Sequence, residues 1–143
     1  MSAMLYDLTI SDRLPSPAGD GRGLPAGVEF VSLREIAAGA AAAARSRSLA
    51  RMLFRVAAAF DPPLPLTVSD RQHVLIALAG RDCIGLSIIE PEGSFGFDML
   101  TWVEVLWRHQ GIGTAMKYRA VQNSHRAGIT ALWAPGLPRE LPD

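Results

Sequence analysis

The sequence predicts a mixed α/β fold (α+β) in one domain, built on a central sheet. Short apolar runs rich in β-branched and aromatic residues are bounded by turn residues, which is typical of strands. A longer segment carries apolar residues at three- and four-residue spacing, which is typical of an amphipathic helix. Two glycines stand between a predicted strand and a predicted helix. With 143 residues, 49% of them hydrophobic, the chain is large enough for one core.

Both ends of the chain have the composition of tails. Residues 1–27 are expected to be an N-terminal tail or linker: Met1 to Ile10 is interpreted as a short strand or a disordered tail, and prolines and glycines follow it. Residues 135–143 contain three more prolines and are expected to be a C-terminal tail. The domain itself is therefore expected over residues 28–134.

The first half of this domain is predicted to hold a strand followed by helix. Val28 to Leu33 alternates apolar and polar residues, which favours a strand. Ser32 and Glu35 have the spacing of a capping box, which favours the start of a helix. One long helix or two short ones are expected between Arg34 and Phe60, because the prolines after Asp61 cannot continue a helix.

The second half is predicted to hold strands around a single helix. The expected strands cover His73 to Ala79, Cys83 to Glu90, Phe97 to Leu106 and Ile129 to Trp133. The first two are expected to pair as a hairpin. The helix is expected to begin at Gly113 or Thr114 and to run to about Ala127, where a glycine follows.

Charge and cysteine content argue against several classes of function. Lys plus Arg and Asp plus Glu both number 14, so we expect no basic field for nucleic acid or a membrane surface. No apolar run reaches the length of a membrane span, and the N-terminus lacks the pattern of a signal peptide. Cys83 is the single cysteine, so no disulfide within the chain is possible and a reducing cytoplasm is the expected location. Its side chain is interpreted as buried and not as a nucleophile. The three histidines lack metal-ligand spacing, so no metal is expected.

The most informative stretch joins the predicted strand Phe97 to Leu106 to the helix after it. It comprises Arg108, His109, Gln110, Gly111, Ile112, Gly113 and Thr114. The first amides of a helix lack intrahelical partners and lie at the positive end of its dipole, so they bind phosphate, and glycine leaves room for it. We interpret the stretch as a cradle for a pyrophosphate, with Arg108 adding charge at the rim. A simple tight turn is the structural alternative. A Walker loop is excluded because Thr114 stands where lysine is required, and a dinucleotide fingerprint because Met116 replaces the third glycine.

These residues resemble the acetyl-CoA loop of the GNAT N-acetyltransferases. The segment "TWVEVLWRHQGIGTAMKYRAVQNSHRAGITAL" is similar to the central part of that family, and "HVLIALAGRDCIGLSII" resembles its second and third strands. The resemblance implies a mostly antiparallel mixed sheet flanked by helices, with acetyl-CoA as the cofactor. It implies that backbone amides from Gln110 to Thr114 bind the pyrophosphate, with His109 in the same loop. It also implies that backbone groups of Val103 and Val105 hold the pantetheine arm, where two strands splay apart.

The activity implied by this resemblance is transfer of an acetyl group to a primary amine of a small molecule or peptide. The alternative is a non-catalytic module that binds acyl-CoA or assembles with another chain. The family continues after its fifth strand with a helix and two strands that carry a frequent tyrosine acid, whereas here no tyrosine follows Tyr118. The last strand is therefore expected to have an open edge. A second copy of the chain in a homodimer, a truncated fold, and Met1 to Ile10 folding back are the alternatives for that edge.

Acetyl transfer to an amine requires a base that accepts the ammonium proton. Glu104 precedes the loop and is the first candidate; its structural alternative is a solvated or ion-paired carboxylate. Asp98 is the second candidate, with a turn residue as its alternative. Arg47, Arg51 and Arg55 share one helical face, which is interpreted as a solvated face or as a surface for an acidic partner.

Overall fold

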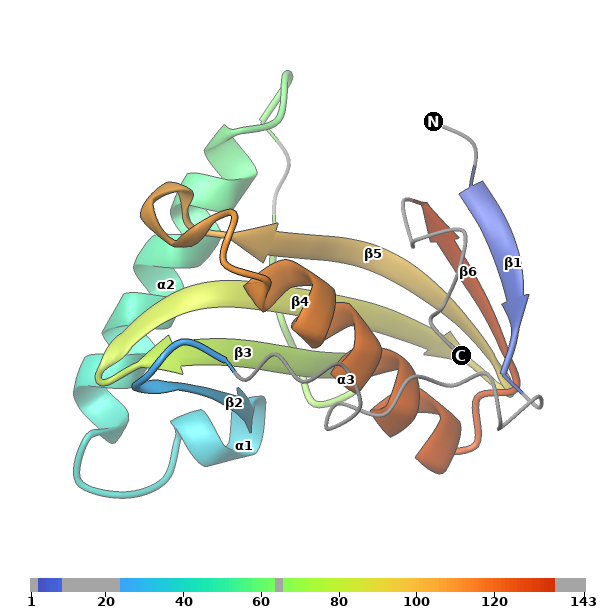
Figure 1. Cartoon of the computed structure of the whole chain (residues 1–143), viewed down its shortest axis with the longest axis horizontal. Helices are drawn as coiled ribbons and strands as arrows, with labels where there is room; N and C mark the ends of the chain where they lie inside the picture. The colour runs from blue at the N-terminus through green and yellow to red at the C-terminus, as the bar shows by residue number, and fades with distance from the viewer. Residues whose placement is uncertain (1–2, 9–23, 64–65, 136–143) are drawn as a thin grey trace.

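The computed structural model describes residues 3–8, 24–63 and 66–135 and contains one six-stranded sheet in the order β1-β6-β5-β4-β3-β2 (Figure 1). The strands are β1 (Ala3–Asp7), β2 (Val28–Ser32), β3 (His73–Ala79), β4 (Asp82–Glu92), β5 (Phe95–Val103) and β6 (Ala131–Pro135). The helices are α1 (Leu33–Ile36), α2 (Ala42–Ala58), the short 3₁₀ helix η2 (Val105–Trp107) and α3 (Ile112–Arg126). The predicted mixed, mostly antiparallel sheet with flanking helices is confirmed.

Neighbouring strands are antiparallel except for β5 and β6, which are parallel. The β3–β4 hairpin was predicted, and its strands pair from His73 with Ile89 to Ala79 with Asp82. The parallel pair follows from the connection, because β5 returns to β6 through α3 on one face of the sheet.

Helices cover both faces of the sheet. In Figure 1, α3 crosses in front of the sheet and α2 lies behind it. The buried face of α2 presents Leu49, Met52 and Val56 to an apolar cluster of the central strands. On the other face, Met116 of α3 packs so close that a Cβ at Gly85 would lie 2.9 Å from its Sδ atom. Gly85 therefore lets α3 lie directly on the sheet.

The helical region after β2 contains two helices, which was one of the two expected arrangements. The Ser32 hydroxyl accepts a hydrogen bond from the amide of Glu35, and the Glu35 carboxylate accepts one from the amide of Ser32, so the predicted capping box is present. A turn with Gly39 at φ 86° separates α1 from α2. This left-handed conformation favours glycine and ends the continuous helix there.

β5, the strand before the glycine loop, ends earlier than expected. It was predicted to extend to Leu106, but β5 ends at Val103 and η2 occupies Val105–Trp107. Most apolar side chains in this stretch do not face the core: Val105 and Leu106 are largely exposed. Strand-like composition was therefore misleading at these positions, because their side chains are not buried against either face of the sheet.

The N-terminal segment covers the edge that the sequence analysis expected to be open. β1 runs antiparallel to β6, with Ala3 opposite Pro135 and Asp7 opposite Ala131. The next residue, Leu8, is fully buried, and its amide donates to the carbonyl of Thr130 at 2.8 Å. Of the three alternatives for this edge, folding back of the N-terminal segment is the one observed. Residues 3–7 of the expected tail are thus part of the sheet; residues 9–23 of that tail lie outside the described residues.

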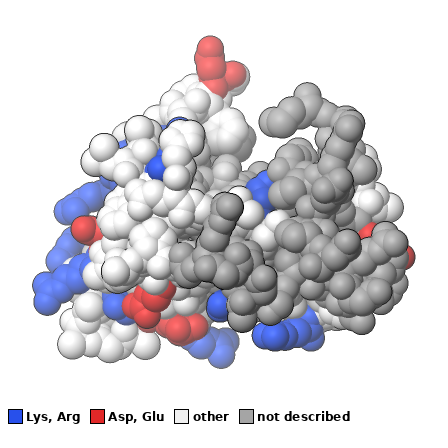
Figure 2. Space-filling model, in the orientation of Figure 1, with Lys and Arg blue, Asp and Glu red and all other residues white. Residues whose placement is uncertain are grey.

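The charged side chains are mixed in sign over the surface that Figure 2 shows. Basic side chains lie mainly along the left and lower margins of the view, with acidic ones among them. Within the described residues, no helix is long and apolar enough to cross a membrane.

Candidate functional site

The loop between β5 and α3 opens the helix with a sharp change of backbone direction. Gly111 is the N-cap residue of α3 and has φ 83°, and His109 has φ 65°. Both residues are in the left-handed region, which favours glycine and is uncommon for histidine. No side chain caps this helix end. The amides of Ile112, Gly113 and Thr114 therefore point out of the helix without an intrahelical acceptor.

These amides face a groove of about 470 Å³. Most of the residues that line it come from the loop and the first turns of α3, and the rest from β5 and η2. The lining residues are Thr101, Val103, Trp107, Arg108, His109, Gly111, Ile112, Gly113, Thr114 and Lys117. A cationic side chain, exposed amides and the positive end of the helix dipole thus meet in one concave site, which favours an anion.

Arg108 links the loop to the end of β5. Its Nε atom donates to the carbonyl oxygen of Val103 at 2.8 Å, and its guanidinium carbon lies 4.7 Å from the centre of the Trp102 ring. This cation–π contact and the hydrogen bond hold the side chain along the strand. The carbonyl of Val103, which was predicted to hold a pantetheine arm, therefore already accepts one hydrogen bond and has one lone pair left.

β5 and β6 separate beyond their first residues. Their parallel pairing covers only Phe95–Phe97 and Ala131–Trp133, whereas β5 continues to Val103. Figure 1 shows the two strands diverging from a common end. Among the described residues, the part of β5 from Asp98 to Val103 thus has only β4 as a neighbouring strand, and no strand lies on the side that faces β6. This is the splayed geometry that the sequence resemblance implied.

A bulge in β5 changes which side chains face α3. Opposite β4, Leu100 pairs with Ile88 and Asp98 pairs with Ile89, so Met99 is an extra residue. Asp98 has one carboxylate oxygen, Oδ1, that is buried without a partner among the described residues. Burial raises the pKa of Asp98 above its ordinary value, while the charge of Lys117 and a hydrogen bond with the backbone of Leu100 lower it in part. Asp98 is therefore a partly buried carboxylate within β5, not the turn residue that was its alternative.

Glu104 is bound to a residue of α2. Nε of Arg55 donates to Oε1 of Glu104 at 3.0 Å, and the same two residues form an ion pair. The amide of Glu104 also donates to the carbonyl of Ile84 at 2.8 Å. The ion-paired alternative for this side chain is thus the one observed. Glu104 and Val105 line a second hollow of about 400 Å³ next to the groove, together with Arg51 and Arg55.

Comparison with known proteins gives a clear result only at the level of structure. No protein-family model matches the sequence, and no curated protein is significantly similar to it. A GCN5-related N-acetyltransferase from Kribbella flavida superposes with a TM-score of 0.59 and 16% identity, over 94% of this chain and 47% of that one. A ribosomal-protein-alanine N-acetyltransferase from Brucella melitensis biovar Abortus superposes with a TM-score of 0.56 and 18% identity, over 78% and 80%. This chain has the GNAT fold.

Coverage of the neighbours differs widely within the GNAT fold. The chain spans about half the length of the Kribbella flavida protein. An IAA acetyltransferase from Bacillus cereus superposes with a TM-score of 0.53 and 18% identity, over 75% of this chain and 64% of that one. At these identities the likeness concerns the fold, and the activity has to be argued from the site.

The GNAT fold brings together most of the site residues that the sequence predicted. Val103, Arg108, His109, Gly111, Ile112, Gly113 and Thr114 line one groove, whereas Gln110 is exposed and lines none of the described pockets. Sequence reasoning did not place Thr101 and Lys117 there. Their spacing could have indicated it, because Thr101 is two residues before Val103 on a strand and Lys117 one turn after Thr114.

Cys83 lies on β4, which α2 covers in this GNAT fold. Burial raises the pKa of its thiol to about 11, against smaller opposing effects of Ser48 and Arg45. The thiol is therefore protonated and unreactive at neutral pH, which agrees with the interpretation as a buried packing residue. Among the described residues, no group of His, Cys, Asp and Glu side chains could hold a metal ion.

Proposed function

We propose that this chain binds acetyl-CoA in the groove at the start of α3 and transfers the acetyl group to a primary amine of a small molecule or peptide. The observation that carries the proposal is the uncapped helix end of α3, which opens into a groove of about 470 Å³ beside a splayed strand. Backbone amides from Gln110 to Thr114 would bind the pyrophosphate, and Arg108 and His109 would lie at its rim.

Two features of the groove fit this cofactor. A Cβ at Gly113 would meet only Cγ2 of Val103, at 3.5 Å, so the packing of the protein itself does not require glycine there. A side chain at this position would instead compete with a ligand at the amides. In addition, Oγ1 of Thr101 is buried without a partner among the described residues and belongs to the groove lining. An unpartnered buried hydroxyl suits a ligand with amide groups, such as pantetheine.

The chemistry requires an activated acyl group and a proton acceptor. Bound acetyl-CoA supplies the thioester. Backbone groups of Val103 and Val105, next to the splayed part of β5, would orient it, and a carboxylate would accept the proton of the acceptor ammonium. Attack of the free amine on the thioester carbonyl would break the carbon–sulfur bond, and the proton that the nitrogen then loses would go to the leaving sulfur. Glu104 was the first candidate for this role, but Arg55 already holds its carboxylate. Asp98, the second candidate, has a raised pKa and no ion pair among the described residues, but it lines neither the groove nor the hollow beside it, so it stays the alternative base.

The acceptor class in this proposal rests on the names of proteins with the same fold. They include a ribosomal-protein-alanine N-acetyltransferase and an aminoglycoside acetyltransferase, with TM-scores of 0.56 each. The alternative function is a non-catalytic module that binds acyl-CoA. The ion pair of Glu104 with Arg55 favours it, because that pair occupies the first candidate base.

Calorimetric titration with acetyl-CoA tests the binding half of the proposal. We expect saturable binding to the unmodified chain and at least about tenfold weaker binding to Gly113→Glu, because the new carboxylate would lie against the pyrophosphate. Gly113→Gln, of the same size without the charge, should lose less affinity. Thr67→Glu places the same charge at an exposed residue that does not line the groove, and this variant should bind acetyl-CoA as the unmodified chain does.

Thiol release from acetyl-CoA in the presence of a panel of amines tests the catalytic half. Binding with amine-dependent thiol release supports the transferase, and binding without release by any amine supports the module. Absence of acetyl-CoA binding by the unmodified chain would mean that Gly111 and Gly113 only turn the backbone, and both functions would be rejected.

A further inference from the structure

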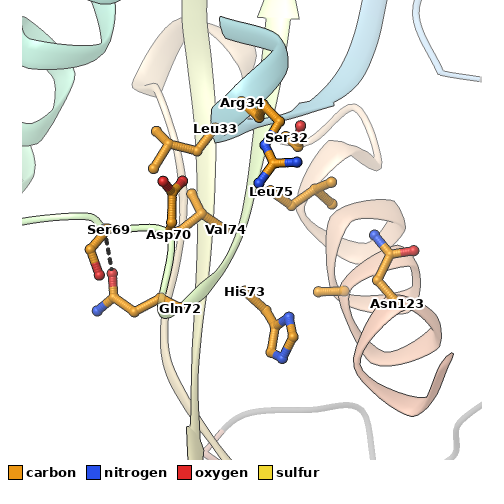
Figure 3. Close-up of a pocket in the computed structure, with 11 residues that line it drawn as sticks. Ser32, Leu33, Arg34, Ser69, Asp70, Gln72, His73, Val74, Leu75 and Asn123 are labelled. Atoms are coloured by element: carbon orange, nitrogen blue, oxygen red, sulfur yellow. Dashed lines mark hydrogen bonds between the residues drawn. The ribbon is translucent and has the colours of Figure 1, made fainter. Parts of the chain in front are cut away.

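A second pocket lies away from the groove, where the end of β2, the start of β3 and the second half of α3 meet (Figure 3). Its volume is about 340 Å³, and it shares no lining residue with the groove at the start of α3. Asn123 of its wall follows Gly113 by ten residues on α3, which corresponds to about 15 Å along the helix. A ligand in this pocket would therefore occupy a site separate from the proposed acetyl-CoA site.

The pocket combines an apolar floor with a rim of opposite charges. Leu75 and Ala120 are buried beneath it. Arg34 and Asp70 are exposed and form its rim, whereas His73 and Asn123 are partly buried along its wall. Figure 3 shows these four side chains around the pocket. The floor thus offers contact to an apolar group, and the rim offers a guanidinium and a carboxylate.

Neither charge at the rim is neutralised by a neighbour in the described part of the chain. The ion pairs among residues 3–8, 24–63 and 66–135 join Arg45 to Glu29 and Arg55 to Glu104, so Arg34 and Asp70 pair neither with each other nor with another described residue. A simple anion would meet repulsion from Asp70, and a simple cation would meet repulsion from Arg34. A ligand that carries both charges satisfies both side chains.

We propose that this pocket binds a small zwitterion with an apolar side chain, of the size of an apolar α-amino acid. The carboxylate of the ligand pairs with the guanidinium of Arg34, and its ammonium pairs with the carboxylate of Asp70. Asn123 and His73 add hydrogen bonds along the wall, and the apolar side chain of the ligand covers Leu75 and Ala120. The site does not depend on the proposed acetyl-CoA site or on catalysis.

Calorimetric titration with L-leucine tests this site, with two analogues that each lack one charge. These are 4-methylpentanoate, without the ammonium, and 3-methylbutylamine, without the carboxylate. We expect leucine to bind the unmodified chain at least about tenfold more tightly than either analogue. In Arg34→Gln, leucine and 3-methylbutylamine should bind equally, because the partner of the carboxylate is gone. In Asp70→Asn, leucine and 4-methylpentanoate should bind equally, because the partner of the ammonium is gone.

Two control variants each remove a charge of the same kind, one positive and one negative, from a residue outside the pocket. Arg71→Gln and Asp61→Asn alter exposed side chains that do not line it and should retain the affinity for leucine. Absence of leucine binding to the unmodified chain would overturn the proposal, as would an affinity that is the same in Arg34→Gln or Asp70→Asn. Acetyl-CoA binding, measured in the same two pocket variants, should be unchanged; a parallel loss would show that the pocket is not a separate site and would also overturn it.

Discussion

Two carboxylates, Asp98 within β5 and Glu104 just after it, differ in what surrounds them. Glu104 is 18% exposed and paired with Arg55, so its negative charge is compensated. Asp98 has a buried oxygen without a partner among the described residues, and burial raises its pKa. A charged carboxylate in such a place costs free energy of folding, whereas a proton acceptor for an ammonium benefits from the raised pKa. The same feature thus opposes stability and favours the proposed chemistry.

Replacing Asp98 by asparagine should raise the free energy of unfolding at about pH 7. Its folded-state pKa lies above the ordinary value of 3.8, so the wild-type side chain contributes most to stability below that value and loses this contribution as pH rises through the folded-state pKa. The stabilisation by Asp98→Asn should therefore be present at about pH 7 and absent at about pH 3. Urea unfolding at both pH values measures it.

The exposed residue Asp70 provides the control, because Asp70→Asn should change stability little at either pH. A loss of stability in Asp98→Asn at neutral pH would show that the hydrogen bond and Lys117 outweigh burial. The same variant separates the two candidate bases: turnover should fall by about a hundredfold in Asp98→Asn and less in Glu104→Gln if Asp98 is the base.

At the level of elements, the contact between Arg55 and Glu104 ties α2 to the junction between β5 and the glycine loop. Arg55 precedes the end of α2 by three residues, and Glu104 follows the last residue of β5. The two residues lie 49 positions apart in the sequence. The ion pair therefore links α2, which packs on one face of the sheet, to the segment that leads into the proposed cofactor site.

A double-mutant cycle of Arg55→Gln and Glu104→Gln should give a coupling energy of about 0.5–1 kcal/mol in the free energy of unfolding. The value is modest because half of the Arg55 side chain is exposed and solvent screens the pair. The pair of Arg45 with Glu29 is the comparison, since its atoms are 3.5 Å apart and Glu29 is 59% exposed; its coupling should be smaller. Equal coupling in the two pairs would contradict a specific role for the contact at the loop.

At the level of the whole molecule, the N-terminal segment completes the sheet on the far side of β6. The pairing of β1 satisfies the backbone groups of β6 that would otherwise form an open edge. Leu8 then enters the apolar cluster that contains Ile129 and Leu132 and has no exposed surface. This arrangement makes residues 3–8 part of the folded domain.

Leu8→Ala should lower the free energy of unfolding by about 2–5 kcal/mol, because it removes a fully buried side chain and leaves a cavity. Leu5→Ala is the matched control in the same segment; Leu5 is 55% exposed, so the change should stay within about 0.5 kcal/mol. Denaturant unfolding of both variants measures the difference. Similar small effects in the two variants would mean that the segment does not dock in solution.

The features that depend on local interactions could be predicted from the sequence. The apolar runs of β3 and β4, the capping box of Ser32 and Glu35, and the glycine loop before α3 all follow from residues that are close together in the sequence. Their positions in the structure agree with the prediction to within a few residues. The resemblance to the GNAT fold also rested on such local motifs, and the structure confirmed it.

Contacts between distant segments are visible only in the folded chain. The partner of β6 comes from the start of the chain, and the partner of Glu104 comes from α2, so no local pattern could indicate either contact. The bulge at Met99, which brings Asp98 toward α3, is set by the pairing of β5 with β4. Arg34 and Asp70 likewise line one pocket only because α1 and the loop before β3 fold onto the same end of the sheet. Such contacts depend on how the whole chain packs, and the hydrophobic periodicity of a single segment carries no information about its distant partners.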